Sequence, residues 1–339
     1  LETIAKDGPQ SFYRGEFAGA LDRYARESGA LLRAEDLAGY EARWREPLRS
    51  TYRGYELIGQ PPVSVGVAVL EAMQILEQLP IEGLSDVSVE RIHLQVEAMK
   101  IAMTDVRAHL GDPAFVSERA VAELLDRKRA AARGAQINPA QAGSYEPANL
   151  FAQAGTDTSY AAVIDADGNA VSLLQSVFHI FGSGEVIPGT GTLMNNRMTG
   201  FSLDPASPNV LEPGKRTMHT LNPLLVRKGG RTMMCLGTPG GPSQTYTNME
   251  LLMRVIDDGL DLQRAIDAPR WFVTPDGDLN VERSVSADVL ARLAARGHRV
   301  ADFPAHSASF GGAGIIRINA GNVREAAADP RRETYALAC

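Results

Sequence analysis

The stretch TSYAAVIDADGNAVSLLQSV, residues 158–177, contains two apolar-rich runs separated by a short polar segment. Residues 158–164 and 170–177 carry the β-branched and apolar side chains that favour strands. The intervening residues 165–169, DADGN, combine the residue types that favour a tight turn. Their acidic side chains could also suggest a calcium loop, but the glycine stands at the wrong place and no distal glutamate completes an EF-hand. We therefore predict a β-hairpin.

Downstream of this hairpin, further short strands and longer helices follow. The patterns predict strands at Leu224 to Val226 and Thr232 to Leu236, a helix from about Ser243 to Asp258, and a helix from about Ala287 to Ala295. Gly259 closes the first helix and Ser286 is the expected N-cap of the second. Strands and helices mixed in this way indicate an α+β layered sandwich.

Upstream of the hairpin, apolar residues recur mostly at helical spacing. They predict helices around residues 17–25, 67–79 and 89–110, and Tyr52 to Gly59 reads as one strand. From residue 134 the composition shifts to Gln, Asn, Pro, Ala and Gly, so residues 134–157 are expected to be a linker. Residues 1–5 already resemble the middle of a helix, and we expect further residues before Leu1.

Length and composition limit the classes of function. The 339 residues suggest two domains or one large one, with 44% hydrophobic and 22% charged residues. The 34 basic and 41 acidic residues give a net charge of −7, which offers no electrostatic reason to bind nucleic acid or an anionic membrane. No apolar run approaches the roughly 20 residues of a membrane span. With only two cysteines, a disulfide framework and a cysteine-based zinc site are both unexpected.

Two glycine-rich regions could carry function. Residues 181–191 hold the pairs Gly182/Gly184 and Gly189/Gly191, but they lack the strand–helix context of a dinucleotide-binding loop. A loop that needs positive φ angles is the simpler interpretation. Gly240 and Gly241 lie between a predicted strand and a predicted helix, where backbone N–H groups could form an oxyanion hole or simply make a tight turn.

The familiar catalytic and metal-binding patterns do not account for this sequence. It contains no Gly-x-Ser-x-Gly and no His-Glu-x-x-His motif, and its six histidines show no metal-ligand spacing. His93, on a predicted helix, is expected to be a packing residue. Cys235 lies in an apolar run and is expected to be a buried structural thiol. We expect neither a metal ion nor a cofactor.

Taken in order, several motifs resemble the γ-glutamyltransferase family, and the resemblance covers essentially the whole chain. In the second half they are Thr158-Ser159, the segment 163–172, Phe181 to Gly184, Pro188 to Gly191, Asn195-Asn196, Phe201-Ser202, Pro213 to Arg216, Gly240-Gly241 and Asp267 to Arg270. In the first half they are Phe12 to Gly15, Glu35 to Tyr40, Tyr52 to Tyr55 and Leu110 to Pro113. These resemble the small subunit and the second half of the large subunit, respectively.

The resemblance implies a self-cleaving precursor with an N-terminal nucleophile. The Thr158 hydroxyl would attack the carbonyl of Asp157, and the freed α-amino group of Thr158 would then serve as its general base. The supporting hydroxyl maps onto Ser176, and the oxyanion hole maps onto the N–H groups of Gly240 and Gly241. The large-subunit portion, residues 1–157, and the small subunit, residues 158–339, are expected to form one structural domain after cleavage.

The implied substrate pocket departs from the family pattern. Near Asn196, the positions expected to hold an amide and an acidic side chain carry Arg197 and Gly200, and the asparagine expected two residues after Ser176 is Phe178. His219 and Thr220 stand in place of two serines that hold a carboxylate. A cationic Arg197 would favour an acyl group bearing a carboxylate, although it could instead be a surface or structural arginine. We therefore assign Asn196, Arg197, His219 and Thr220 to substrate binding.

These departures resemble the acylase and amidohydrolase branch of the family. The expected fold is the four-layer αββα sandwich of the N-terminal-nucleophile hydrolases, and the expected activity is hydrolysis of a small, anionic amide. Two alternatives stay open: a true γ-glutamyl transferase or glutathione hydrolase, and an unprocessed, non-catalytic family member. Family members carry a further N-terminal portion and are often exported, so either a periplasmic or a cytoplasmic location fits.

Overall fold

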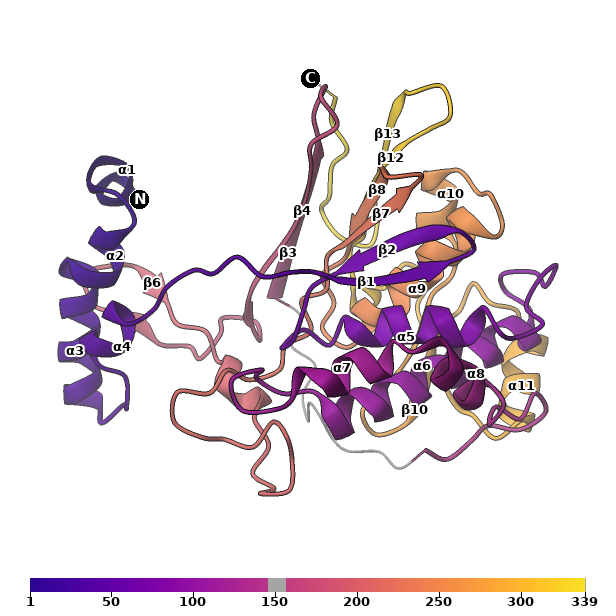
Figure 1. The fold of residues 1–339 in the computed structure, drawn as a ribbon, viewed down its shortest axis with the longest axis horizontal. Helices are drawn as coiled ribbons and strands as arrows, with labels where there is room; N and C mark the ends of the chain where they lie inside the picture. The colour runs from indigo at the N-terminus through magenta and orange to yellow at the C-terminus, as the bar shows by residue number, and fades with distance from the viewer. Residues whose placement is uncertain (146–156, 339) are drawn as a thin grey trace.

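The computed structural model describes residues 1–145 and 157–338. Its centre is a six-stranded sheet in which every neighbouring pair runs antiparallel. In spatial order the strands are β1 (Leu48–Tyr52), β2 (Tyr55–Gly59), β7 (Leu224–Lys228), β8 (Arg231–Gly237), β12 (Gly314–Ile318) and β13 (Arg324–Ala328). The first two strands come from the segment before residue 157 and the other four from the segment after it (Figure 1).

The hairpin predicted at 158–177 forms a separate two-stranded ribbon. Its strands are β3 (Asp157–Ile164) and β4 (Ala170–Phe178), joined by a turn in which Asp165 Oδ1 accepts the N–H groups of Asp167 and Asn169. The ribbon packs on β8 and β12. A Cβ built on Gly237 would lie 2.4 Å from the Tyr160 ring, so only glycine allows this approach.

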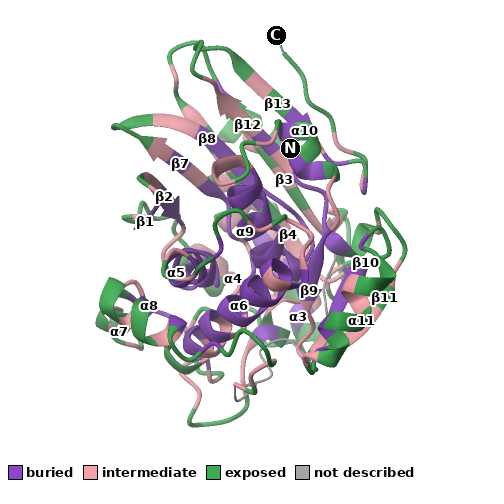
Figure 2. Ribbon diagram, turned by 90° about the vertical axis from the view of Figure 1, so that its right-hand side faces the viewer, coloured by how far each residue is buried: buried purple, intermediate pink, exposed green. Residues whose placement is uncertain are grey.

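Helices α5 (Val67–Leu76) and α9 (Ser243–Ile256) pack on the other face of the six-stranded sheet, and α6 (Val89–His109) packs on α5 (Figure 2). Alternation along β8 explains the two faces, because Met234 and Leu236 join the core beneath the helices whereas Gly237 faces the ribbon. Cys235 is fully buried, as predicted, and burial raises the pKa of its thiol to about 11. The described residues thus form helix, sheet and ribbon layers.

The remaining elements surround this core. They are α7 (Glu118–Leu124), α8 (Arg127–Gly134), α10 (Leu262–Asp267), α11 (Ala287–Ala295), the short 3₁₀ helices η1 (Arg197–Gly200) and η2 (Ala308–Phe310), the hairpin of β5 (Val186–Ile187) and β6 (Thr192–Leu193), and a sheet of β9 (Trp271–Val273), β10 (Asp278–Glu282) and β11 (Arg299–Phe303). The Ser286 hydroxyl caps α11 by accepting the Val289 N–H, as predicted. None of the helices described combines the length and apolar character needed to cross a membrane.

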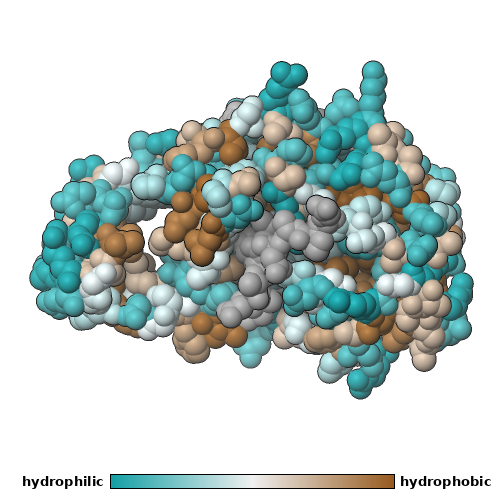
Figure 3. Space-filling view, turned by 90° about the horizontal axis from the view of Figure 1, so that it is seen from below, coloured by the Kyte–Doolittle hydropathy of each residue, from teal (hydrophilic) through white to brown (hydrophobic). Residues whose placement is uncertain are grey.

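The N-terminal helices form an arm to one side of this body (Figure 1). They are α1 (Glu2–Asp7), α2 (Gln10–Arg14), α3 (Glu16–Ser28) and α4 (Ala34–Ala38). A hydrogen bond between the Tyr24 hydroxyl and Glu185 links the arm to the β5 hairpin. The space-filling view shows an opening between part of this arm and the body (Figure 3).

One strand prediction was wrong and one prediction falls partly outside the described residues. Tyr52 to Gly59 is not a single strand, because Arg53 and Gly54 adopt positive φ angles of 48° and 77° and turn the chain back on itself. A Gly at the second of two such positions is typical of a tight hairpin turn. Of the expected linker, residues 146–156 lie outside the described part of the chain.

Candidate active site

Thr158 lies near the start of β3, directly after a β-bulge between residues 157 and 158. Its strand register places it opposite Ser176 of β4, and its Oγ1 donates a hydrogen bond to Ser176 Oγ at 3.0 Å. Ser176 Oγ also accepts the backbone N–H of Phe178 at 2.8 Å. The predicted nucleophile and its predicted supporting hydroxyl therefore meet, with the Thr158 hydroxyl oriented by a second polar side chain. The backbone of Asp157 lies in the same strand.

The chain turns sharply just beyond Ser176. Phe178 has a φ of 78°, a conformation that costs of order 1–3 kcal/mol for a non-glycine residue and often occurs at functional sites. Its ring stacks on His179 with the centroids 4.4 Å apart. The Arg197 guanidinium lies over the same ring, 4.2 Å from its centroid. Phe178, which stands in place of the expected asparagine, thus supplies the aromatic ring on which the Arg197 guanidinium packs.

Arg197 begins the short helix η1 and is half-buried. Its Nη1 is buried and has no hydrogen-bond partner within residues 1–145 and 157–338. Burial alone lowers the pKa of this guanidinium to about 10, so it stays charged at neutral pH. A buried donor without a partner is costly, and one explanation is that a ligand supplies the acceptor.

Two histidines next to Arg197 also carry ring nitrogens without partners. Asn196 Nδ2 lies 2.6 Å from His179 Nδ1, which makes Nδ1 the acceptor and leaves the proton on Nε2. This Nε2 is buried without a partner in the described chain, and so is His219 Nδ1. Burial and the nearby Arg197 charge lower the pKa of His219 to about 4. Arg197 Nη1, His179 Nε2 and His219 Nδ1 are therefore three buried nitrogens to which a ligand could form hydrogen bonds.

Gly240 and Gly241 form the connection between β8 and α9. Both are buried and have positive φ angles of 134° and 57°. Their carbonyl oxygens accept the N–H groups of Ser243 and Gln244 at 3.2 Å each. Neither of their own N–H groups donates a hydrogen bond to another described residue, which leaves both available for an oxyanion. The first residues of β3 pack on the end of β8, which brings this connection to the side of the sheet where Thr158 lies.

His219 and Thr220 lie in a loop that pairs with residues 63–65, the segment that follows β2. His219 forms a parallel bridge with Ser64, donating its N–H to Val63 O and accepting the Val65 N–H. Thr220 is buried, and its carbonyl oxygen accepts a hydrogen bond from Asn222 Nδ2. These backbone contacts fix the loop that carries both predicted substrate-binding residues.

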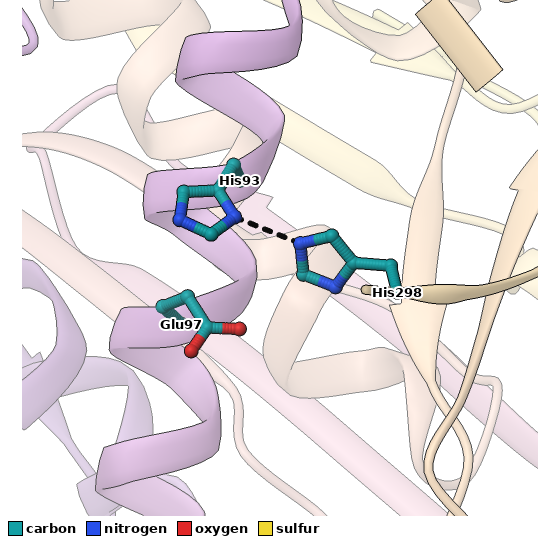
Figure 4. Close-up of side chains that lie close together, drawn as sticks. All are labelled: His93, Glu97 and His298. Atoms are coloured by element: carbon teal, nitrogen blue, oxygen red, sulfur yellow. Dashed lines mark hydrogen bonds between the residues drawn. The ribbon is translucent and has the colours of Figure 1, made fainter. Parts of the chain in front are cut away.

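The structure also brings together His93, Glu97 and His298, three buried residues whose ligand-type atoms all lie within 4.8 Å (Figure 4). His93 Nε2 lies 2.8 Å from the Asn138 carbonyl and must donate to it, so His298 Nε2 donates to His93 Nδ1 at 2.8 Å. The Glu97 carboxylate accepts from Lys100 Nζ and from a backbone N–H. These hydrogen bonds already engage the ligand-type atoms and join α6 to the segments around Asn138, Gly143 and His298, which is a structural role.

Sequence reasoning missed His179 in the site. The signal was present, since His179 directly follows Phe178, which was already recognised as a departure from the expected pattern. It was overlooked because nothing in the linear sequence pairs His179 with Asn196. The His93–His298 contact was also missed, because the two residues are 205 positions apart.

The chain is similar to proteins of the family that its sequence motifs resemble. A family model described as gamma-glutamyltranspeptidase matches residues 1–339. The chain is 39% identical over 305 residues to the "Acylase ACY 1 proenzyme" of Pseudomonas sp. (strain SE83), covering 90% of this chain and 54% of that protein. It is 35% identical over 346 residues to the "Glutathione hydrolase-like YwrD proenzyme" of Bacillus subtilis (strain 168), covering 99% and 64%. The chain therefore spans less than two-thirds of either curated relative.

A solved structure is also similar. The cephalosporin acylase from Bacillus halodurans superposes with a TM-score of 0.87 at 37% identity, covering 97% of this chain and 60% of that chain. This likeness confirms the α+β fold predicted from the sequence.

Proposed function

Because this chain belongs to the gamma-glutamyltranspeptidase family and has the fold of the N-terminal-nucleophile hydrolases, we propose that it is a self-processing amide hydrolase with Thr158 as its nucleophile. The observation that carries the proposal is the hydrogen bond from Thr158 Oγ1 to Ser176 Oγ at the bulged start of β3. A hydroxyl held in this way has a fixed direction of attack, which is the main requirement for a positioned nucleophile.

Processing would begin at the Asp157–Thr158 bond. The Thr158 hydroxyl oxygen attacks the carbonyl carbon of Asp157, its proton passes to the departing Thr158 nitrogen, and the amide becomes an ester. Water then hydrolyses this ester, which releases the Asp157 carboxylate and a Thr158 with a free α-amino group. The products would be residues 1–157 and the 182 residues from 158 to 339 (339 − 158 + 1). Because β2 pairs with β7 inside one sheet, the two pieces would stay associated.

Hydrolysis of a substrate would use the same nucleophile. The Thr158 α-amino group takes the proton of its own hydroxyl while Oγ1 attacks the substrate carbonyl carbon. The N–H groups of Gly240 and Gly241 stabilise the negative charge that develops on the carbonyl oxygen. The protonated amine then gives its proton to the leaving nitrogen. Water attacks the resulting ester, and Thr158 is restored.

The substrate we propose is a small amide with an anionic acyl group. Arg197 supplies a positive charge and a buried Nη1 without a partner, while His179 supplies a buried Nε2–H. Both would donate to a carboxylate, and Asn196 holds the His179 ring in the required orientation. We also propose that His219 and Thr220 line this pocket. The same positive charge disfavours the ammonium group of a γ-glutamyl substrate, which makes transfer of a γ-glutamyl group the less favoured alternative.

Intact mass spectrometry tests the processing step. The wild-type protein should convert with time into two polypeptides separated at the Asp157–Thr158 bond, and Thr158→Ala should remain one chain. A wild-type chain that stays intact after long incubation would favour a non-catalytic family member. Cleavage of the Thr158→Ala variant at the same bond would refute the assignment of the nucleophile.

A matched substrate pair tests the acyl preference. Glutaryl-p-nitroanilide and γ-glutamyl-p-nitroanilide differ only in the α-amino group. The processed protein should hydrolyse the glutaryl compound with the higher kcat/KM. Faster turnover of the γ-glutamyl compound would contradict the proposed substrate class while leaving Thr158 as the nucleophile.

A further inference from the structure

A second binding site is indicated by a cavity of about 340 Å³ between the helical layer and the β9–β10 turn. One wall is a single face of α6, formed by Lys100, Met103, Thr104 and Arg107, whose spacing of three and four residues places them in one stripe. The first turn of α9 and the segment 142–145 contribute other walls. Of the predicted site residues, only Thr220 lines it, so the cavity adjoins the candidate active site without containing the nucleophile.

Arg107 is the unusual residue of this cavity. It forms no hydrogen bond and no ion pair with another residue in the described parts of the chain, although its Nε is buried. The other cations on the lining are paired: Lys100 Nζ donates to Glu97 at 2.7 Å and Arg299 Nε lies 2.9 Å from Asp278. Burial lowers the pKa of the Arg107 guanidinium.

The remaining lining defines the shape of a suitable partner. The sole carboxylate among the lining residues is Asp276, which is exposed and lies in the β9–β10 turn. Apolar or aromatic surface comes from Val65, Met103, Tyr145 and Val273. The volume lies at the lower end of the usual range for small-molecule sites. A ligand with one carboxylate and a compact apolar body would match this distribution of charge and surface.

We propose that this cavity binds a small monocarboxylate whose carboxylate pairs with Arg107 and whose apolar body packs against Met103 and Tyr145. A guanidinium can hold a carboxylate through two parallel hydrogen bonds, which is the strongest arrangement open to this side chain. Glu97 ties two walls of the cavity together, because it accepts hydrogen bonds from Lys100 Nζ on α6 and from the Gly143 N–H in the segment 142–145. Neither Thr158 nor Arg197 lines this cavity, although Thr220 lies on its wall and is also assigned to the proposed acyl pocket.

Calorimetric titration with benzoate and with benzamide, its uncharged analogue of the same shape, tests the proposal directly. Benzoate should bind, and benzamide should bind at least tenfold more weakly. Arg107→Gln should weaken benzoate binding at least tenfold, and Arg107→Lys should restore part of it. Arg119→Gln, which alters an exposed arginine of α7, is the matched control and should bind benzoate like the wild type.

Thermal unfolding provides a second readout and checks the fold of each variant. Benzoate should raise the Tm of the wild type and of Arg119→Gln but not that of Arg107→Gln. Equal affinity for benzoate and benzamide, or undiminished benzoate binding by a folded Arg107→Gln variant, would overturn the proposal. Absence of benzoate binding to the wild type would overturn it as well. None of these outcomes depends on turnover, so they leave the proposed hydrolysis untouched.

Discussion

Ser176→Ala is the most informative change to the proposed catalytic centre. The substitution removes two hydrogen bonds that end at Ser176 Oγ, one from Thr158 Oγ1 at 3.0 Å and one from the Phe178 N–H at 2.8 Å. Each such bond is worth about 0.5–1.5 kcal/mol net. If both act on the orientation of the nucleophile, their loss raises the barrier by about 1–3 kcal/mol. At about 1.4 kcal/mol per factor of ten, kcat should fall roughly 5- to 150-fold.

Ser176→Ala should slow both proposed reactions of Thr158, self-cleavage and amide hydrolysis. The rate of self-cleavage can be followed by gel electrophoresis of freshly purified precursor, and the rate of amide hydrolysis by release of p-nitroaniline from processed protein. Ser176→Thr keeps a hydroxyl at this position and should retain most of both rates. A change of less than twofold in Ser176→Ala, or an equal loss in Ser176→Thr, would show that the hydroxyl does not orient Thr158.

Three further changes probe the pocket and the core. Arg197→Gln should raise KM for a carboxylate-bearing amide roughly 10- to 150-fold with a smaller effect on kcat, because a hydrogen bond to a charged group is worth about 1.5–3 kcal/mol. Steady-state kinetics measures both constants, with Arg197→Lys as the control. The pKa of His219 is about 4 in the folded state against an ordinary 6.5, so the unfolded state takes up the proton first. The stability contributed by neutral His219 is therefore complete above pH 6.5 and is lost as pH falls toward 4. In His219→Gln, the free energy of unfolding measured with urea should depend less on pH between 6.5 and 4. Asp329→Ala should cost about 3–5 kcal/mol in the same urea assay, because it leaves the buried guanidiniums of Arg270, 2.6 Å away, and Arg331, 3.2 Å away, without this carboxylate. A loss below about 1 kcal/mol would contradict the structural role of that ion pair.

Local patterns predicted those parts of the fold whose signals lie close together in sequence. The β3–β4 hairpin, the start of α6 at Val89 and the N-cap at Ser286 all depend on residues within a few positions of one another. The β1–β2 hairpin was missed because its turn, Arg53-Gly54, carries only one residue type that signals a reversal.

The candidate site was predictable only in part. Thr158 and Ser176 were named from the family resemblance, and the register of the β3–β4 hairpin sets them opposite each other. Arg197 could be named, but not the stacking of its guanidinium on Phe178, since that contact depends on a positive φ angle that phenylalanine rarely adopts. The buried nitrogens without partners are properties of packing, and no spacing in the sequence encodes them.

The pairing of β2 with β7 has a thermodynamic consequence. These strands lie on opposite sides of the Asp157–Thr158 bond and share one continuous hydrogen-bonded sheet. While the bond is intact, unfolding is a unimolecular reaction whose midpoint does not depend on protein concentration. Once the bond is cut, the same unfolding releases two chains, so the midpoint rises with concentration by mass action. Self-cleavage would thus change the reaction order of unfolding while leaving the sheet itself unchanged.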